Sequence, residues 1–266
     1  MKTAFLSSRR ANAPLAIFFA GWGMDETPFA DFSAAADGCD LILCFDYTTL
    51  DFDQSIFDGR EIRRVAAWSL GVWAASALFA QIPALASASE RIAFNGTPFP
   101  ADDTRGIPEA IYDGTLAGLS ASTLAAFERR MCRDPETLAR YNSRRPARSL
   151  ESLRDELASI RAAAKTTPIA PAFTRAIIGS RDAIFPPANQ TVAWSGLCHA
   201  EQIDAPHYSD ATLRAIINDG IKNDVRHIFF NAETQRRRDA KNSKNSASPR
   251  LCVSALKSSN LSGGCA

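Results

Sequence analysis

The stretch R-R-V-A-A-W-S-L-G-V-W-A-A-S-A-L-F at residues 63–79 decides the fold of this chain. Its short apolar run Val65–Ala67 predicts a buried strand, and the longer run Leu70–Gln81 predicts a buried helix that ends before Pro83. Ser69 stands between the two. A serine in this place is typical of a nucleophile elbow, a sharp turn that exposes the hydroxyl above a sheet.

The residues around this serine are Ala67-Trp68-Ser69-Leu70-Gly71, where the usual elbow pattern is G-x-S-x-G. Alanine in the first position is small enough for a turn in which bulky side chains would collide. On this motif alone, a helix N-cap serine with a glycine nearby remains an alternative interpretation. The remaining motifs of the chain have to decide between the two.

Apolar runs that alternate with helical patterns predict an α/β fold with a mainly parallel sheet. The 266 residues, with a 46% hydrophobic share and a formal net charge of +1, are enough for one globular domain with a full core, which we place at residues 1–230. The further predicted strands are Met1–Ser8, Leu15–Phe19, Leu41–Phe45, Arg91–Asn95, Arg175–Ile178 and Glu201–Ile203. The further predicted helices are Pro28–Ala36, Asp53–Arg60 and Ala211–Lys222.

The segment from about residue 108 to 168 lacks any strand pattern. It contains three helical patterns, at Ser122–Cys132, Pro135–Asn142 and Leu150–Ala164. A crossover between parallel strands needs only about a dozen or more residues. We therefore interpret the segment as a helical cap over the carboxyl edge of the sheet, where open α/β sheets bind ligands. Ordinary crossover helices are the alternative.

Residues 231–266 differ from the rest of the chain in composition. They contain seven Lys and Arg against two Asp and Glu, and no aromatic residue. Such a segment is predicted to be disordered. A role in nucleic-acid binding is conceivable for a basic tail, but a non-functional extension is the favoured interpretation, and no nucleic-acid partner is expected.

Several classes of protein are not expected from the composition. The chain has no apolar run of the ~18 residues that a membrane span needs, and no signal-peptide cleavage site follows Leu15–Ala20. The six cysteines form no C-x-x-C pair and the three histidines have no zinc-site spacing. We expect a cytoplasmic protein with reduced cysteines, no metal and no membrane association.

A serine nucleophile needs a histidine base, and His207 is the best candidate of the three histidines. It follows Pro206 in a loop between the last predicted strand and the last predicted helix. In hydrolases built on this kind of sheet, the chain order is serine, acid, histidine. His199 is expected to precede the last strand and His227 to follow the final helix, so both are assigned to surface or core positions.

The acid that orients this histidine should follow the strand before the histidine strand. Asp182 does so, after a glycine that allows a turn and before the apolar pair Ile184-Phe185. Asp204 is a rival, but it is close to the histidine in the chain and is expected at a strand end. Asp102 and Asp103 are more remote candidates.

Backbone N–H groups are expected to bind the oxyanion of an ester-hydrolysing serine. Leu70 N–H follows the nucleophile, and Trp22 N–H lies in the loop Gly21-Trp22-Gly23, where two glycines allow close approach. The elbow, this loop, the acid and the base occur in the right order, each at the carboxyl end of a strand. The set predicts a serine hydrolase that needs no cofactor.

The chain resembles the BioG family of pimeloyl-[acyl-carrier protein] methyl ester esterases, α/β-hydrolases of biotin synthesis. The BioH esterases of the same pathway are similar at Gly21–Gly23 and Trp68–Gly71, and alanine at position 67 is typical of BioG. The resemblance covers about Leu15 to Ile221 and does not include the tail. The motifs that carry it are Phe18–Asp25, Ala67–Val72, Asn95–Pro98, Ile178–Asp182 with Phe185-Pro186, and Ala205–Tyr208.

The resemblance implies hydrolysis of the methyl ester at the far end of a pimeloyl chain that acyl-carrier protein holds. A basic cap could steer docking of an acidic carrier protein, although the same arginines also fit a solvated helix face. Phe127 and Met131 are candidate acyl-chain contacts, with simple core packing as the alternative. The arginines of the predicted docking patch are Arg129, Arg130, Arg133, Arg140, Arg144, Arg145 and Arg148.

Two other functions remain open at this point. One is a general short-chain carboxylesterase or thioesterase with the same serine, acid and histidine. The other is a non-catalytic hydrolase fold that only binds an acyl group or a partner.

Overall fold

The computed structural model describes residues 1–6, 10, 12–34 and 38–219, and its strands form one sheet. The strands are β1 (Lys2–Phe5), β2 (Leu15–Phe19), β3 (Asp40–Phe45), β4 (Ile62–Trp68), β5 (Glu90–Phe94), β6 (Arg175–Arg181) and β7 (His199–Pro206). Their order in the sheet is β1-β3-β2-β4-β5-β6-β7. Only β1 pairs antiparallel, at the edge beside β3, and every other pairing is parallel.

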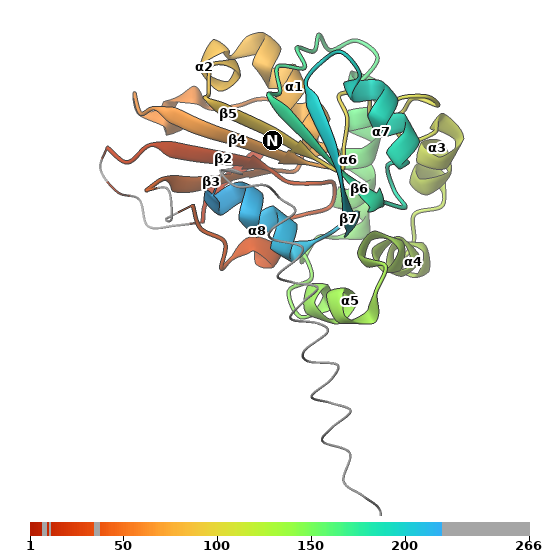
Figure 1. Ribbon diagram of the computed structural model, residues 1–266. Coiled ribbons are helices and arrows are strands. Elements are labelled where there is room, and N and C mark those ends of the chain that lie inside the picture. The colour runs from red at the N-terminus through yellow and green to blue at the C-terminus, as the bar shows by residue number, and fades with distance from the viewer. Residues whose placement is uncertain (7–9, 11, 35–37, 220–266) are drawn as a thin grey trace, which may run out of the picture. The chain divides into compact units, whose positions relative to one another are not determined.

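The central strands are buried because helices cover both faces of the sheet. Every residue of β2 and β3 is buried, as expected for apolar runs inside a parallel sheet. The covering helices are α1 (Gly71–Gln81), α2 (Pro83–Ala86), α7 (Pro187–Trp194) and α8 (Asp210–Asp219). Figure 1 shows α1 and α2 on one side of the sheet and α8 on the other. The predicted α/β architecture is thereby confirmed.

Four helices occupy the insertion between β5 and β6. They are α3 (Glu109–Ala117), α4 (Ala121–Cys132), α5 (Pro135–Asn142) and α6 (Leu150–Ala163), grouped beyond one end of the sheet (Figure 1). Bonds from Trp22 to Leu153 and from Tyr47 to Glu156 join α6 to the loops after β2 and β3, at the carboxyl edge. The insertion therefore covers the edge where ligands bind in such folds.

Three helices are absent from the sequence prediction, and one of them, α2, has only four residues. Helix α3 buries only Tyr112 within its own span and contains Gly114, so its amphipathic pattern is weak. Helix α7 is only eight residues long, which is near the lower limit at which a period can be recognised. Packing against the rest of the fold, more than a local sequence pattern, determines where α3 and α7 form.

One predicted helix is wrong and one is reduced. Of the predicted helix Pro28–Ala36, the described residues 28–34 contain only part of a short 3-10 helix, η1 (Thr27–Phe29), and Phe29 and Phe32 turn inward and pack edge to face on each other. The predicted helix Asp53–Arg60 is reduced to a 3-10 helix, η3 (Gln54–Phe57). The predicted tail, residues 231–266, lies outside the described residues.

Candidate active site

The chain turns sharply between β4 and α1 at Ser69, which has φ +59° although it is not glycine. Its backbone N–H donates to Phe94 O at 3.1 Å. Two glycines make room for this turn. A Cβ at Gly71 would lie 2.4 Å from Ala20 O, and a Cβ at Gly96 would lie 2.2 Å from Ser69 O. The strained backbone of Ser69 is thus packed between the segments that follow β2 and β5.

Ser69, His207 and Asp182 lie in one hydrogen-bonded line. The distance from Ser69 Oγ to His207 Nε2 is 2.9 Å, and that from His207 Nδ1 to Asp182 Oδ2 is also 2.9 Å. All three residues are buried. They come from the turn after β4, from the loop after β7 and from the turn after β6, so the parallel sheet brings together residues up to 138 positions apart.

The carboxyl group of Asp182 is held by four hydrogen bonds. Its Oδ1 accepts from the backbone N–H groups of Ile184 (2.8 Å) and Phe185 (3.0 Å). Its Oδ2 accepts from Gln190 Nε2 at 3.0 Å and faces His207. Gln190 was missed in the sequence because a single glutamine in an unrecognised short helix carries no signal. The four partners fix the orientation of the carboxylate toward the imidazole.

The backbone beside the imidazole is held by Asn95. Its Nδ2 donates to Pro206 O (2.8 Å) and His207 O (3.0 Å), and its Oδ1 accepts from Gly179 N (2.6 Å). Asn95 thereby joins the ends of β5, β6 and β7. Phe185 stacks on the imidazole with an interplanar angle of 10°. Asn95 belongs to the N-G-T-P motif, but its role is visible only in the structure.

A pocket with mostly apolar lining opens in front of Ser69. Its walls come from the loop after β2 and from the cap, and Phe127 and Met131 of α4 both line it. Phe127 packs edge to face on Trp22, with ring centroids 5.3 Å apart. The other lining residues include Ile107, Ile111, Tyr112, Arg130, Leu157 and Ile184. A pocket with this lining can bury an apolar ligand beside the serine.

Two backbone N–H groups in this pocket have no intramolecular acceptor. Trp22 and Leu70 both line the pocket, and no hydrogen bond within the described residues uses either N–H. The loop of Trp22 lies against the elbow, since a Cβ at Gly21 would be 3.1 Å from Ser69 Cβ. Both donors are therefore available to a ligand atom near the serine.

The seven arginines of the predicted docking patch divide into two groups. Arg129, Arg130 and Arg133 are exposed on or just after α4 and form no ion pair within the described part of the chain. The others pair with acidic groups of the protein: Arg140 with Glu136, Arg144 with Asp31, Arg145 with Glu128, and Arg148 with Asp46 and Glu156.

Arg148 does not belong to a docking surface. Its side chain is only 7% exposed, and it lies between the carboxylates of Asp46 and Glu156. The sequence prediction is wrong for this residue because a basic run does not reveal which of its members turn inward. The exposed part of the predicted patch centres on α4.

The rival residues from the sequence lie away from the pocket. His199 is the first residue of β7 and is exposed, and Asp204 is in the same strand, paired with Arg181. Asp102 pairs with Arg105, and none of these residues lines the pocket at Ser69. The remaining rivals are Asp103, which caps Glu109 N–H, and His227, which lies outside the described residues.

The described residues also bear on metal sites, disulfides and membrane spans. They contain no group of three or more His, Cys, Asp or Glu side chains placed to hold a metal ion. Cys39, Cys44, Cys132 and Cys198 are free thiols. Within the same residues, no helix has the length and apolar character that crossing a membrane requires.

The fold and the hydrogen-bonded site place this protein among the α/β-hydrolases. The structure is similar to the peroxisomal α/β-hydrolase Lpx1 from Saccharomyces cerevisiae, with a TM-score of 0.50 and 17% identity over 92% of this chain and 90% of that one. At this identity the likeness shows the fold alone.

The family is shown by a match to a family model and by a solved structure of higher sequence identity. The family model described as pimeloyl-ACP methyl esterase BioG matches residues 1–214, and the chain therefore belongs to the BioG family. The structure is also similar to the crystal structure of BioG from Haemophilus influenzae, with a TM-score of 0.69 and 36% identity over 79% of this chain and 94% of that chain.

A third relative is a longer protein. A Bacteroides fragilis protein named malonyl-[acyl-carrier protein] O-methyltransferase is 44% identical over 202 residues, which are 74% of this chain. The match spans only 40% of that protein's length. The BioG family and the α/β-hydrolase fold together support a carboxylic ester hydrolase.

Proposed function

We propose that the protein is a serine carboxylesterase that hydrolyses the methyl ester of pimeloyl-[acyl-carrier protein]. The observation that carries this proposal is the line from Ser69 through His207 to Asp182 at the base of an apolar pocket. A buried serine within 2.9 Å of an oriented imidazole can be activated as a nucleophile.

The reaction would proceed in two steps on these residues. His207 Nε2 accepts the proton from Ser69 Oγ as that oxygen forms a bond to the ester carbonyl carbon. The N–H groups of Trp22 and Leu70 stabilise the oxyanion. The bond from carbon to the methoxy oxygen then breaks, and methanol leaves with the proton from His207. Water repeats the sequence on the acyl-enzyme and releases the free carboxylate.

The substrate class is supported by the pocket, the family and the surface charge. The pocket around Phe127 and Met131 suits the apolar chain of a pimeloyl group. Carrier proteins are acidic, and the three unpaired arginines on and after α4 suit an acidic partner. The Bacteroides relative is named for methyl transfer to a carrier-bound malonyl group, a reaction that forms the class of bond proposed here for cleavage, a methyl ester on a carrier-bound acyl group.

The test is mass spectrometry of pimeloyl-carrier methyl ester after incubation with wild type and with Ser69→Ala. Loss of one methylene's mass from the carrier adduct with wild type only is the expected result, with turnover by the variant lower by at least about 1,000-fold. Release of the whole acyl group would mean a thioesterase. No change, alongside hydrolysis of small esters, would mean a general esterase. No reaction with any ester or covalent serine probe would overturn the catalytic assignment.

A further inference from the structure

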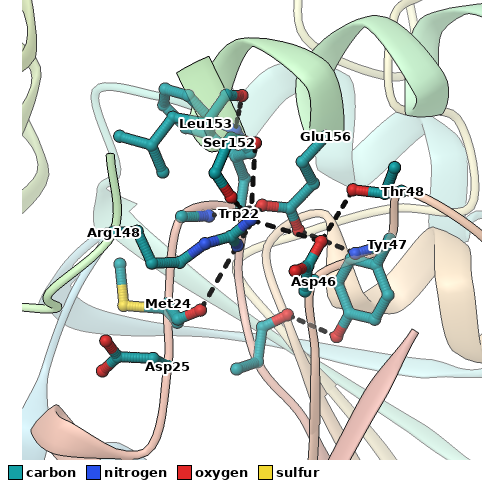
Figure 2. Close-up of polar contacts among 12 residues, drawn as sticks. Trp22, Met24, Asp25, Asp46, Tyr47, Thr48, Arg148, Ser152, Leu153 and Glu156 are labelled. Carbon is teal, nitrogen blue, oxygen red and sulfur yellow. Dashed lines mark hydrogen bonds and ion pairs between the residues drawn. The ribbon is translucent and has the colours of Figure 1, made fainter. Parts of the chain in front are cut away.

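A buried carboxylate of the cap lies behind the loop that presents the Trp22 N–H. Glu156 of α6 has a fully buried side chain. Its Oε2 accepts from Gly23 N at 3.1 Å, and its Oε1 accepts from Tyr47 N at 3.0 Å. Arg148 Nη1 lies 2.6 Å from Oε2. Figure 2 shows the carboxylate between the side chain of Arg148 and the backbone of Tyr47.

The same loop receives further bonds from the cap. Trp22 Nε1 donates to Leu153 O at 2.8 Å, and Asp25 Oδ2 accepts from Ala147 N at 2.7 Å. Leu153 and Glu156 are three residues apart on α6 and so share one face of the helix. Leu153, Glu156 and Ala147 of the cap therefore bond directly to three of the four residues from Trp22 to Asp25. Arg148 also reaches the fourth, at Met24 O.

A second route leads from Glu156 to the start of this loop. Tyr47, whose N–H binds Glu156, donates its hydroxyl to Ala20 O at 2.7 Å and to Cys44 O at 3.0 Å. Ala20 immediately precedes the Gly21-Trp22-Gly23 loop. The carboxylate thus contacts the loop at Gly23 and, through Tyr47, is linked to the residue that precedes the loop.

The contacts of Glu156 are better explained by a role in positioning the backbone than by a contribution to the free energy of unfolding. Burial raises the pKa of Glu156, while the charge of Arg148 and the two backbone N–H groups oppose this rise. A buried ion pair contributes little net stability, because desolvation of both charges offsets their attraction. Fully satisfied buried polar groups instead specify one arrangement of the backbone around them.

We infer that Glu156 is a positioning residue for the oxyanion-binding loop and that the cap is part of the catalytic apparatus. Glu156 accepts the N–H of Gly23, and the preceding residue, Trp22, lines the pocket with a backbone N–H that has no acceptor within the described residues. Because the oxyanion forms only during reaction, misplacement of this donor should lower kcat much more than it changes KM. This inference rests on the proposed esterase activity.

The test compares Glu156→Gln with wild type on a small methyl ester. Glutamine has one acceptor oxygen for two backbone donors, and its NH₂ group would face another donor, so the loop should shift. We expect kcat to fall about 10- to 100-fold with KM within about twofold. The affinity for a trifluoromethyl ketone, whose adduct with Ser69 places an oxyanion in the pocket, should fall in parallel. Asp155→Asn, an exposed change on the same helix, should leave both unchanged.

A second variant covers the case in which Glu156→Gln does not fold. Trp22→Phe keeps an aromatic ring beside Phe127 but removes the donor to Leu153 O. We expect its kcat to fall about 3- to 10-fold, with ketone affinity reduced equally.

The outcomes separate this inference from the proposed function. If wild type neither hydrolyses esters nor reacts at Ser69 with a fluorophosphonate, the proposed function fails. If wild type is active and folded Glu156→Gln keeps its kcat and ketone affinity, only the inference is overturned. It is also overturned if activity falls only in proportion to folded protein while Trp22→Phe behaves as wild type.

Discussion

The indole Nε1 of Trp68 donates a hydrogen bond of 2.9 Å to the backbone carbonyl of His207. Trp68 immediately precedes Ser69, so this side chain joins the turn that carries the hydroxyl to the loop that carries the imidazole. The two rings also pack together, with centroids 5.5 Å apart. One tryptophan thereby helps to set the distance between the two groups that exchange the proton in the proposed reaction.

Trp68→Phe should reduce activity by loosening that loop. We expect kcat to fall about 3- to 10-fold with KM nearly unchanged, because one hydrogen bond to the loop is lost. Steady-state kinetics on a small methyl ester measures this. Trp73→Phe is the matched control, since the buried indole N–H of Trp73 has no hydrogen-bond partner among the described residues. Equal kcat values for the two variants would contradict the prediction.

Gln190→Met should separate activity from stability. The change removes the donor to Asp182 Oδ2 and Phe185 O, but it also removes a buried amide oxygen that has no hydrogen-bond partner in the described part of the chain. We expect kcat to fall about tenfold while the free energy of unfolding changes by no more than about 1 kcal/mol. Kinetics and denaturant titration test the two parts. The exposed Gln202→Met should change neither.

Gly96→Ala should destabilise the fold because its Cβ would lie 2.2 Å from Ser69 O. The elbow or β5 must move to admit it, and we expect a loss of about 1–3 kcal/mol in the free energy of unfolding, together with lower activity. Gly114→Ala provides the comparison. It lies within α3 and its Cβ would meet nothing within 4 Å, so we expect a gain of about 0.5–1 kcal/mol. Denaturant unfolding of both variants decides this, and a stable Gly96→Ala would refute the steric argument.

The combined variant Arg129→Glu and Arg133→Glu should impair only the carrier-bound substrate. We expect its kcat/KM for pimeloyl-carrier methyl ester to fall at least tenfold at low salt, because two attractive charges become repulsive. Neither residue lines the pocket at Ser69, so hydrolysis of a small methyl ester should be unchanged. Lys165→Glu, after α6, serves as a charge control. A salt-independent rate on the carrier substrate in wild type would argue against electrostatic docking.

Protonation of Asp102 in acid should make the fold less stable. Burial alone would raise the pKa of Asp102, but bonds from Arg105 and Thr104 outweigh burial and hold it at about 2. Because the folded pKa is below the unfolded value of ~3.9, the stabilisation is present above pH ~4 and is lost as pH falls toward 2. Asp102→Asn should therefore be less stable than wild type by about 1 kcal/mol at pH 6–7. The difference should shrink below pH 4 in thermal melts, and a constant difference would refute the argument.

How far the sequence predicts each element depends on how local its cause is. The strands of the sheet follow from continuous apolar runs such as Leu15–Phe19, and the structure confirms that range residue for residue. Helices α4 to α6 carry their own caps, for example Ser149, whose hydroxyl accepts from Ser152 N. Helices α3 and α7 lack such signals. The segment after η1 is irregular because two phenylalanines pack against each other.

By itself, the sequence determined the order of strands and helices and the residues at the carboxyl ends of the strands. Those positions predict Ser69, Asp182 and His207 as site residues, because a parallel sheet collects its strand ends at one edge. The tertiary structure alone decided which side chains support them. Gln190, Asn95 and Glu156 act through bonds to residues 8 to 133 positions away. Their partners, like the burial of Arg148, depend on the packing of distant elements, which leaves no periodic or local trace in the sequence.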